Sequence, residues 1–159
     1  MTDYYVRPDG SMAVRVTVPA SFAVRDAPKI FPGTELGIED PKDCWILEER
    51  SEGGRFEIVL DSESEDLDNC FFFESECFKK IKDPESCVSD VATFIFFILS
   101  LKSELSGINF PLLVLKGSKG YVLVDILDFE EPELVFYSFD QEENLDSPFL
   151  ATVILPPAL

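Results

Sequence analysis

The apolar run Cys87–Leu105, which reads CVSDVATFIFFILSLKSEL, constrains the fold more than any other segment. It is the only long segment whose apolar residues recur at helical spacing, and its phenylalanines make the two central turns apolar almost all round. We therefore expect a helix that is buried on more than one side, capped at Asp83 and ended by Ser106-Gly107. The run before Lys102 falls well short of the roughly 20 apolar residues of a transmembrane helix, so we interpret it as a core helix.

Length and composition predict one globular domain over residues 1–159. The chain has 159 residues, of which 46% are hydrophobic, and this is enough to bury a core without disulfides or a metal. Its 15 phenylalanines are many for this length, and we expect most of them to pack between a helix and a sheet.

Cysteine spacing and the lack of histidine argue against a structural metal. Cys44, Cys70, Cys77 and Cys87 include no C-x-x-C pair, and the chain has no histidine to complete a zinc site. The N-terminal sequence MTDYYVRPDG has no apolar signal-peptide core. We expect four free thiols, a cytoplasmic protein, and no cofactor or metal.

Acidic side chains dominate the charge of this chain. They outnumber basic ones 31 to 13, for a net charge of −18, and residues 120–159 contain no lysine or arginine. Such a field repels nucleic acid and anionic membranes and speeds association with a basic surface. The alternative is that the acidity only keeps a phenylalanine-rich protein in solution or reflects a salt-adapted proteome.

Alternating apolar residues and turn sequences predict two hairpins in the first part of the chain. The first joins Thr2–Arg7 to Met12–Val18, with the valines of the second strand facing the core. The second joins Trp45–Arg50 to Arg55–Leu60. Between the two hairpins we expect Ser21–Asp43 to be an irregular connection that has at most one helical turn and packs on the fold.

Before the helix we expect a strand through Phe71-Phe72-Phe73, and the alternative for this segment is a short amphipathic helix through Glu76–Lys80. Four more strands are expected after the helix. Three of them, Phe110–Lys116, Tyr121–Leu127 and Glu133–Phe139, form a meander, and Phe149–Leu155 lies on or beside the sheet. The whole pattern predicts an α+β fold. In it, a mainly antiparallel sheet of about seven to eight strands packs on one central buried helix.

No catalytic or ligand-binding motif is complete. The acidic run Asp61–Asp68 fails as a calcium-binding EF-hand loop, because Asp66 stands where glycine is needed and Phe72 where glutamate is needed. The glycine-rich segment Lys116–Gly120 leads into a strand, so no helix N-terminus follows to bind a phosphate. Without histidine, the usual serine and cysteine nucleophile systems are absent. We predict a protein that is not an enzyme, and a carboxylate-dependent hydrolase is the least favoured alternative.

The meander is the candidate partner-binding surface, because alternation places tyrosines and carboxylates together on the face opposite to Val122, Val124 and Ile126. The alternative is that a second layer, such as the N-terminal hairpins, covers this face. The predicted partner-binding residues are Tyr121, Asp125, Glu130, Glu131, Glu133, Tyr137, Asp140, Glu142, Glu143 and Asp146. The competing acidic site consists of Glu63, Glu65, Asp66 and Asp68.

These features predict a protein that binds and neutralises a basic protein partner, such as a nuclease, without contacting nucleic acid or membrane itself. By analogy of charge, an immunity protein that blocks a cationic toxin and a nucleic-acid mimic both use this physics. We expect a monomer or a weak homodimer. The second hypothesis is an adaptor that binds another subunit through an exposed apolar and aromatic strand face.

Overall fold

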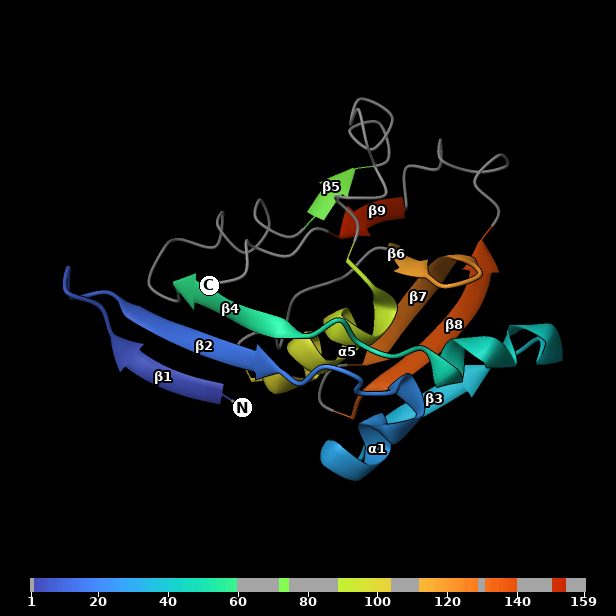
Figure 1. The fold of residues 1–159 in the computed structure, drawn as a ribbon, viewed down its shortest axis with the longest axis horizontal. Helices are drawn as coiled ribbons and strands as arrows, with labels where there is room; N and C mark the ends of the chain where they lie inside the picture. The colour runs from blue at the N-terminus through green and yellow to red at the C-terminus, as the bar shows by residue number, and fades with distance from the viewer. Residues whose placement is uncertain are drawn as a thin grey trace.

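The computed structural model describes residues 2–59, 72–74, 89–103, 112–128, 131–139 and 150–153. Their strands form two sheets, shown in Figure 1. The smaller sheet is antiparallel and has the order β1 (Thr2–Val6), β2 (Met12–Val18), β4 (Gly54–Val59). The larger sheet has the order β3 (Glu35–Ile38), β8 (Glu133–Phe139), β7 (Gly120–Asp128), β6 (Leu112–Gly117), β9 (Leu150–Val153), β5 (Phe72–Glu74).

The predicted α+β class and the mainly antiparallel pairing are confirmed, but the strands form two sheets where the sequence predicted one. In the described part of the chain, only β3 with β8 and β6 with β9 pair in parallel. The N-terminal hairpin, the meander β6-β7-β8 and the late strand β9 lie where the sequence predicted them. Strand β5 agrees with the preferred interpretation of the Phe71-Phe72-Phe73 segment. The helical segments are η1 (Val24–Asp26), α1 (Ala27–Ile30), η2 (Pro41–Glu48) and α5 (Val91–Ser100).

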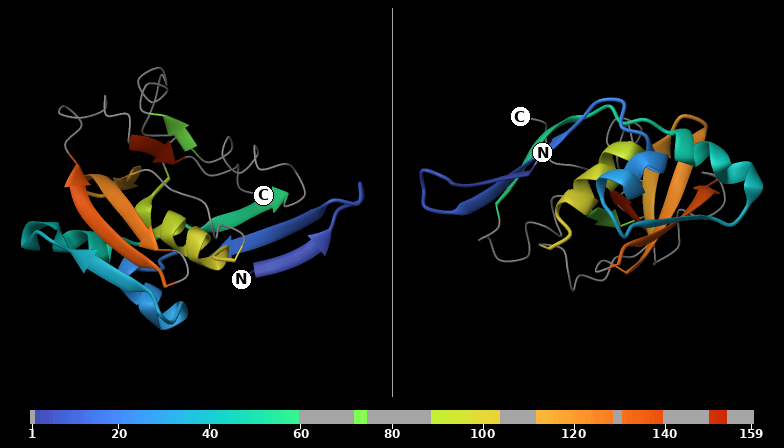
Figure 2. Two further views of the ribbon diagram at one scale, coloured as in Figure 1. Left: turned by 180° about the vertical axis from the view of Figure 1, so that it is seen from behind. Right: turned by 90° about the horizontal axis from the view of Figure 1, so that it is seen from below.

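Helix α5 lies between the two sheets, as Figures 1 and 2 show from three directions. Every residue from Val91 to Leu99 is buried. The helix shares one hydrophobic core with both sheets: the valines of β2 contribute to it from one side, and Val122, Val124, Leu134 and Phe136 from the other. The N-terminal sheet therefore packs on α5 and not on the outer face of the meander.

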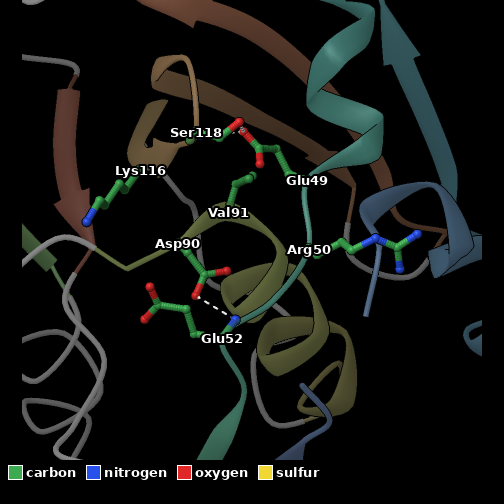
Figure 3. A pocket seen from close by; sticks show the side chains of 8 residues that line it. Glu49, Arg50, Glu52, Asp90, Val91, Lys116 and Ser118 are labelled. Carbon is green, nitrogen blue, oxygen red and sulfur yellow. Dashed lines mark hydrogen bonds between the residues drawn. The ribbon is translucent and has the colours of Figure 1, made fainter. Parts of the chain in front are cut away.

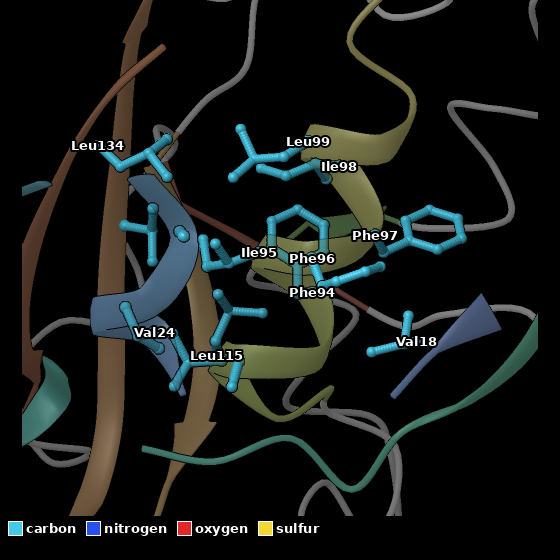
Figure 4. Close-up of a cluster of buried hydrophobic side chains, with 14 of the residues drawn as sticks. Val18, Val24, Phe94, Ile95, Phe96, Phe97, Ile98, Leu99, Leu115 and Leu134 are labelled. Carbon is cyan, nitrogen blue, oxygen red and sulfur yellow. The ribbon is translucent and has the colours of Figure 1, made fainter. Parts of the chain in front are cut away.

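Aromatic rings connect α5 to segments that are distant in sequence, and Figure 4 shows Phe94, Phe96 and Phe97 of α5 within the core. Phe96 meets Phe22 and Phe31 edge to face, with centroids 5.0 and 5.2 Å apart. Phe97 meets Phe56 of β4 in the same way at 5.6 Å. Such pairs contribute about 0.5–1.5 kcal/mol each beyond the burial of their area, so the phenylalanines account for much of the contact between helix and sheets.

Helix α5 is shorter than the predicted run Cys87–Leu105. Asp90 is its N-cap and accepts a hydrogen bond from the Thr93 amide at 2.8 Å, so the predicted cap at Asp83 is wrong. The residues after Ser100 turn away from the helix, and the predicted stop at Ser106-Gly107 lies outside the described residues. Apolar residues continue past both ends of the helix, so periodicity alone overestimated its length.

The predicted strand Trp45–Arg50 is wrong, because Trp45–Glu48 belongs to the 3-10 helix η2 and only Arg50 makes an isolated β-bridge, with Ala23. The Asp40 side chain caps η2 by accepting from the Lys42 amide at 3.1 Å, and Pro41 occupies the first position, where its missing N–H has no cost. Strand β4 therefore pairs with β2 and not with its neighbour in sequence.

The segment Ser21–Asp43 has more regular structure than predicted. It contains η1, α1, the start of η2 and the strand β3, which adds to β8 in parallel. Its predicted packing on the fold is confirmed, since Phe22 and Val24 belong to the core and Phe31, Leu36 and Ile38 pack against it.

Cys44 is exposed and free. Cys70, Cys77 and Cys87 lie outside the described residues. Of the helices in the described part of the chain, none has both the length and the apolar character needed to cross a bilayer.

Candidate functional site

Half of the predicted partner-binding residues fall on described parts of the chain. These are Tyr121, Asp125, Glu131, Glu133 and Tyr137. The acidic residues Glu130, Asp140, Glu142, Glu143 and Asp146, and the competing site Glu63, Glu65, Asp66 and Asp68, lie outside the described residues.

Strand register places the described residues on the outer face of the larger sheet. Val122 and Val124 are fully buried in the core, so their neighbours on β7 face away from α5. On that outer face Leu123 pairs with Tyr137 of β8, and Asp125 pairs with Val135. The predicted division of the meander into two faces is therefore confirmed.

The prediction that Tyr121 is an exposed binding residue is wrong. Only 7% of its surface is accessible, and Val114 and Val135 on the same face are also buried. Alternation tells which side of a sheet a residue faces but not whether that part of the side is covered. The part of the outer face around Tyr121 is therefore covered, whereas Asp125 and Tyr137 are partly exposed.

Strand β3 brings two further carboxylates to this face that the sequence did not identify. Its register pairs Glu35 with Glu133 and Gly37 with Val135. Leu36 and Ile38 pack against the core, so Glu35 and the residue after the strand, Glu39, belong to the outer side. The alternation in ELGIE, between Gly33 and Pro41, could have shown that Glu35 and Glu39 lie on the same side of a strand, but not which strand they would join.

We call the set Glu35, Glu39, Asp125, Glu133 and Tyr137 the anionic face. Strands β3, β7 and β8 contribute to it. Glu35, Glu39 and Glu133 are exposed, and Asp125 and Tyr137 are partly exposed. The exposed Glu131 precedes β8 in the turn next to this face.

Tyr137 is electrostatically coupled to two of these carboxylates. Partial burial raises the pKa of its phenol, and the negative charges of Glu39 and Asp125, together with a side-chain hydrogen bond to Glu39, raise this pKa further. All of these causes favour the neutral phenol. Tyr137 therefore lies at the centre of a local negative field.

The carboxylates of the anionic face have no cationic partner in the described part of the chain. The ion pairs found there join Arg25 to Glu48, Lys29 to Asp26 and Lys42 to Asp40. None of these pairs includes Glu35, Glu39, Asp125 or Glu133. Unpaired carboxylates that share one face produce a field that a cation from outside can satisfy.

The raised pKa of Tyr137 should make the stability of the protein depend on pH in the alkaline range. Because the folded phenol has a raised pKa, its contribution to stability is fully present below about pH 10 and is lost as pH rises through that raised value. Ultraviolet titration, taken as the difference between wild type and Tyr137→Phe, should show this phenol ionising at a higher pH than a free tyrosine. Glu39→Gln should lower its midpoint.

Glu35→Gln is the matched control for that titration, since it removes a charge from the same strand that does not contribute to the raised pKa of Tyr137. A midpoint that does not change in Glu39→Gln would show that Tyr137 and Glu39 are not coupled.

A shallow cleft of about 150 Å³ at the N-terminus of α5 is the second candidate site. It lies between the segment before β4, the first turn of α5 and the β6-β7 turn (Figure 3). Its lining residues are Glu49, Arg50, Glu52, Asp90, Val91, Lys116, Gly117 and Ser118. The side chains of Arg50 and Lys116 point to opposite sides of it.

Two of the three carboxylates of this cleft accept hydrogen bonds that hold neighbouring segments together. Asp90 accepts from the amide and hydroxyl of Thr93 and, at 3.4 Å, from the Glu52 amide. Glu49 accepts from the amide and hydroxyl of Ser118. These bonds join α5 and the β6-β7 turn to the segment that leads into β4, so we assign the cleft a structural role. Among the described residues, no group of three or more cysteine or carboxylate side chains is arranged to hold a metal ion.

No protein-family model matches the chain, and no curated protein or solved structure is detectably similar to it.

Proposed function

We propose that this protein binds a basic protein partner through the anionic face and neutralises the positive surface of that partner. The observation that carries the proposal is that Glu35, Glu39, Asp125 and Glu133 share one face with Tyr137, close to Glu39 and Asp125, and form no ion pair with a cation of the described residues. A basic surface would supply the missing counter-charges. The net charge of −18 would attract that surface over a longer range.

The two residue types of this face have different roles in the proposed complex. Exposed carboxylates mainly accelerate association, and they do so less at high salt, where charges are screened. A partly buried aromatic residue that loses its remaining water on binding mainly slows dissociation. Tyr137 also offers a hydroxyl that can be hydrogen-bonded, as is common for tyrosines at interfaces.

Charge reversal of β3 is the test, with an oligolysine peptide as the probe. Glu35→Lys with Glu39→Lys should slow association about tenfold at low salt and should flatten its dependence on salt between about 0.05 and 0.5 M. Tyr137→Ala should accelerate dissociation, and the loss of this anchor should cost about 2 kcal/mol of binding free energy. Surface plasmon resonance measures both rates, and circular dichroism confirms that each variant is folded.

The matched control is Asp3→Lys with Glu52→Lys, which changes the net charge equally at two exposed positions outside the anionic face. Equal slowing by both pairs would mean that only the total charge matters. An unchanged association rate in Glu35→Lys with Glu39→Lys would reject the anionic face as the binding site.

An adaptor role is the second candidate function, and one observation favours it. The face of the smaller sheet that packs on α5 continues along the hairpin, where Tyr4, Val6 and Met12 are 48, 63 and 37% exposed. Exposed apolar side chains that share one face can bind another subunit. Binding that does not depend on salt and is lost in Val6→Lys would support this role.

A further inference from the structure

Strand β3 forms an edge of the larger sheet. Its neighbour is β8, and in the part of the chain that the structure describes no strand lies on its other side (Figure 1). An edge strand presents backbone N–H and C=O groups that another strand can pair with. Proteins commonly protect such edges with lysine or proline, but β3, with the sequence ELGI, has neither.

The register identifies the backbone groups that face the open edge. Glu35 donates its N–H to the Pro132 carbonyl at 2.7 Å, and in a parallel ladder only alternate residues bond to a given neighbour. Glu35 and Gly37 therefore bond toward β8, while the N–H and C=O groups of Leu36 and Ile38 point the other way. Among the described residues, no hydrogen bond from another segment reaches these four groups.

Side chains on either side of this edge specify the chemistry of an incoming strand. Glu35 and Glu39 lie on the outer side, beside Glu133 and Tyr137, whereas Leu36 and Ile38 lie on the core side and are only partly buried. A strand placed next to β3 would contact carboxylates with every second residue and apolar side chains with the residues between. Lysine or arginine alternating with apolar residues would match both faces.

A second copy of this chain does not fit the same edge. Pairing of β3 with another β3 would bring the Glu35 and Glu39 carboxylates of two chains, each with a net charge of −18, onto one face. Like charges on neighbouring strands are destabilising. The charges that attract a basic strand therefore also prevent self-association at this edge.

We propose that β3 receives an extended segment of the basic partner as an added strand, in which lysine or arginine alternates with apolar residues. This inference rests on the proposed function and specifies how the partner is recognised: main-chain hydrogen bonds to Leu36 and Ile38 give affinity, and the flanking carboxylates select basic side chains. The partner segment would become the seventh strand of the sheet in Figure 1.

Two synthetic peptides of equal length and charge test the proposal on the full chain. One alternates lysine with valine and can add as a strand, and the other alternates lysine with proline, which has no N–H to donate. Hydrogen exchange measured by NMR should show the amides of Leu36 and Ile38 exchanging about tenfold more slowly with the lysine-valine peptide. The lysine-proline peptide should leave both rates unchanged. The Glu35 amide, already bonded to Pro132, is the internal reference.

Leu36→Pro and Leu36→Ala form a matched pair of variants. Both remove the leucine side chain, but only Leu36→Pro removes the N–H that faces the open edge, and it leaves the bonds of Glu35 and Gly37 to β8 in place. Leu36→Pro should bind the lysine-valine peptide about tenfold more weakly than Leu36→Ala does. Circular dichroism shows whether each variant is folded, and the exchange experiment on the wild type does not depend on either.

The outcomes separate this inference from the proposed function. Strand addition is overturned if both peptides bind equally and neither protects the amides of Leu36 and Ile38. If Glu35→Lys with Glu39→Lys still weakens this binding, the charge-driven function stands. If neither peptide shows binding that responds to this charge reversal, the proposed function fails and the inference with it. Slower exchange at Leu36 and Ile38 only with the lysine-valine peptide supports strand addition.

Discussion

Replacement of Ile95 with aspartate is expected to leave the protein unfolded in buffer without denaturant. Ile95 is 0% exposed and lies in the middle of α5, in the core shared by both sheets. An unpaired buried charge costs several kcal/mol, which is comparable with the roughly 5–15 kcal/mol that stabilises a whole domain. The far-ultraviolet circular dichroism spectrum should lose its helical and sheet signal, and urea should produce no cooperative transition.

Two controls separate the buried charge from other effects. Ile95→Val removes one methylene group at the same site and should cost only about 0.5–1.5 kcal/mol. Ser103→Asp adds the same charge just beyond the helix at an exposed position, so its urea midpoint should hardly change. A folded Ile95→Asp protein with a cooperative transition would mean that α5 has a solvent-exposed face and is itself a candidate binding element.

Gly53→Ala is expected to have the second largest effect on stability, about 2–4 kcal/mol. Gly53 has φ = 79°, a conformation that alanine adopts only with strain. A Cβ atom at this position would lie 2.8 Å from the Ala20 nitrogen and 2.9 Å from the Val18 oxygen, both of which are backbone atoms and cannot rotate away. The substitution would therefore force apart the end of β2 and the start of β4.

Gly10→Ala is the matched control for this steric cost. Gly10 has a similar φ of 89° in the hairpin turn, but no atom lies within 4 Å of the position that its Cβ would occupy. This variant should show only the conformational strain, about 1 kcal/mol. The difference between the free energies of unfolding of the two variants, measured with urea, gives the cost of the steric contact at Gly53. Equal losses would contradict the close approach of Gly53 to the end of β2.

Local patterns were sufficient to predict the elements that form the centre of the fold. The alternation of Val14, Val16 and Val18, and the turn between Arg7 and Met12, predicted the N-terminal hairpin because each depends on residues close together in sequence. The length of the apolar run around Ile95 predicted a helix surrounded by core, and α5 is such a helix. Neither prediction required knowledge of what would pack against these elements.

Element boundaries and competing local signals were less well determined by the sequence. Because apolar residues continue on both sides of α5, their spacing did not show that the helix begins after the Asp90 cap. Trp45–Arg50 was predicted as a strand because it precedes the turn sequence Ser51–Gly54, but Asp40 and Pro41 begin the 3-10 helix η2, whose apolar residues pack on the core.

Composition and short-range periodicity encode the α+β class, the buried helix, the meander and the large excess of negative charge, so these properties could be predicted. Which carboxylates lie together depends instead on contacts between distant segments. Strand β3 pairs with β8, nearly one hundred residues later, and this pairing brings Glu35 beside Glu133 and Glu39 beside Tyr137, while Tyr121 is buried. Parallel pairing between distant segments depends on the packing of the whole chain, so no local pattern around Glu35 or Tyr137 could reveal that they share a face.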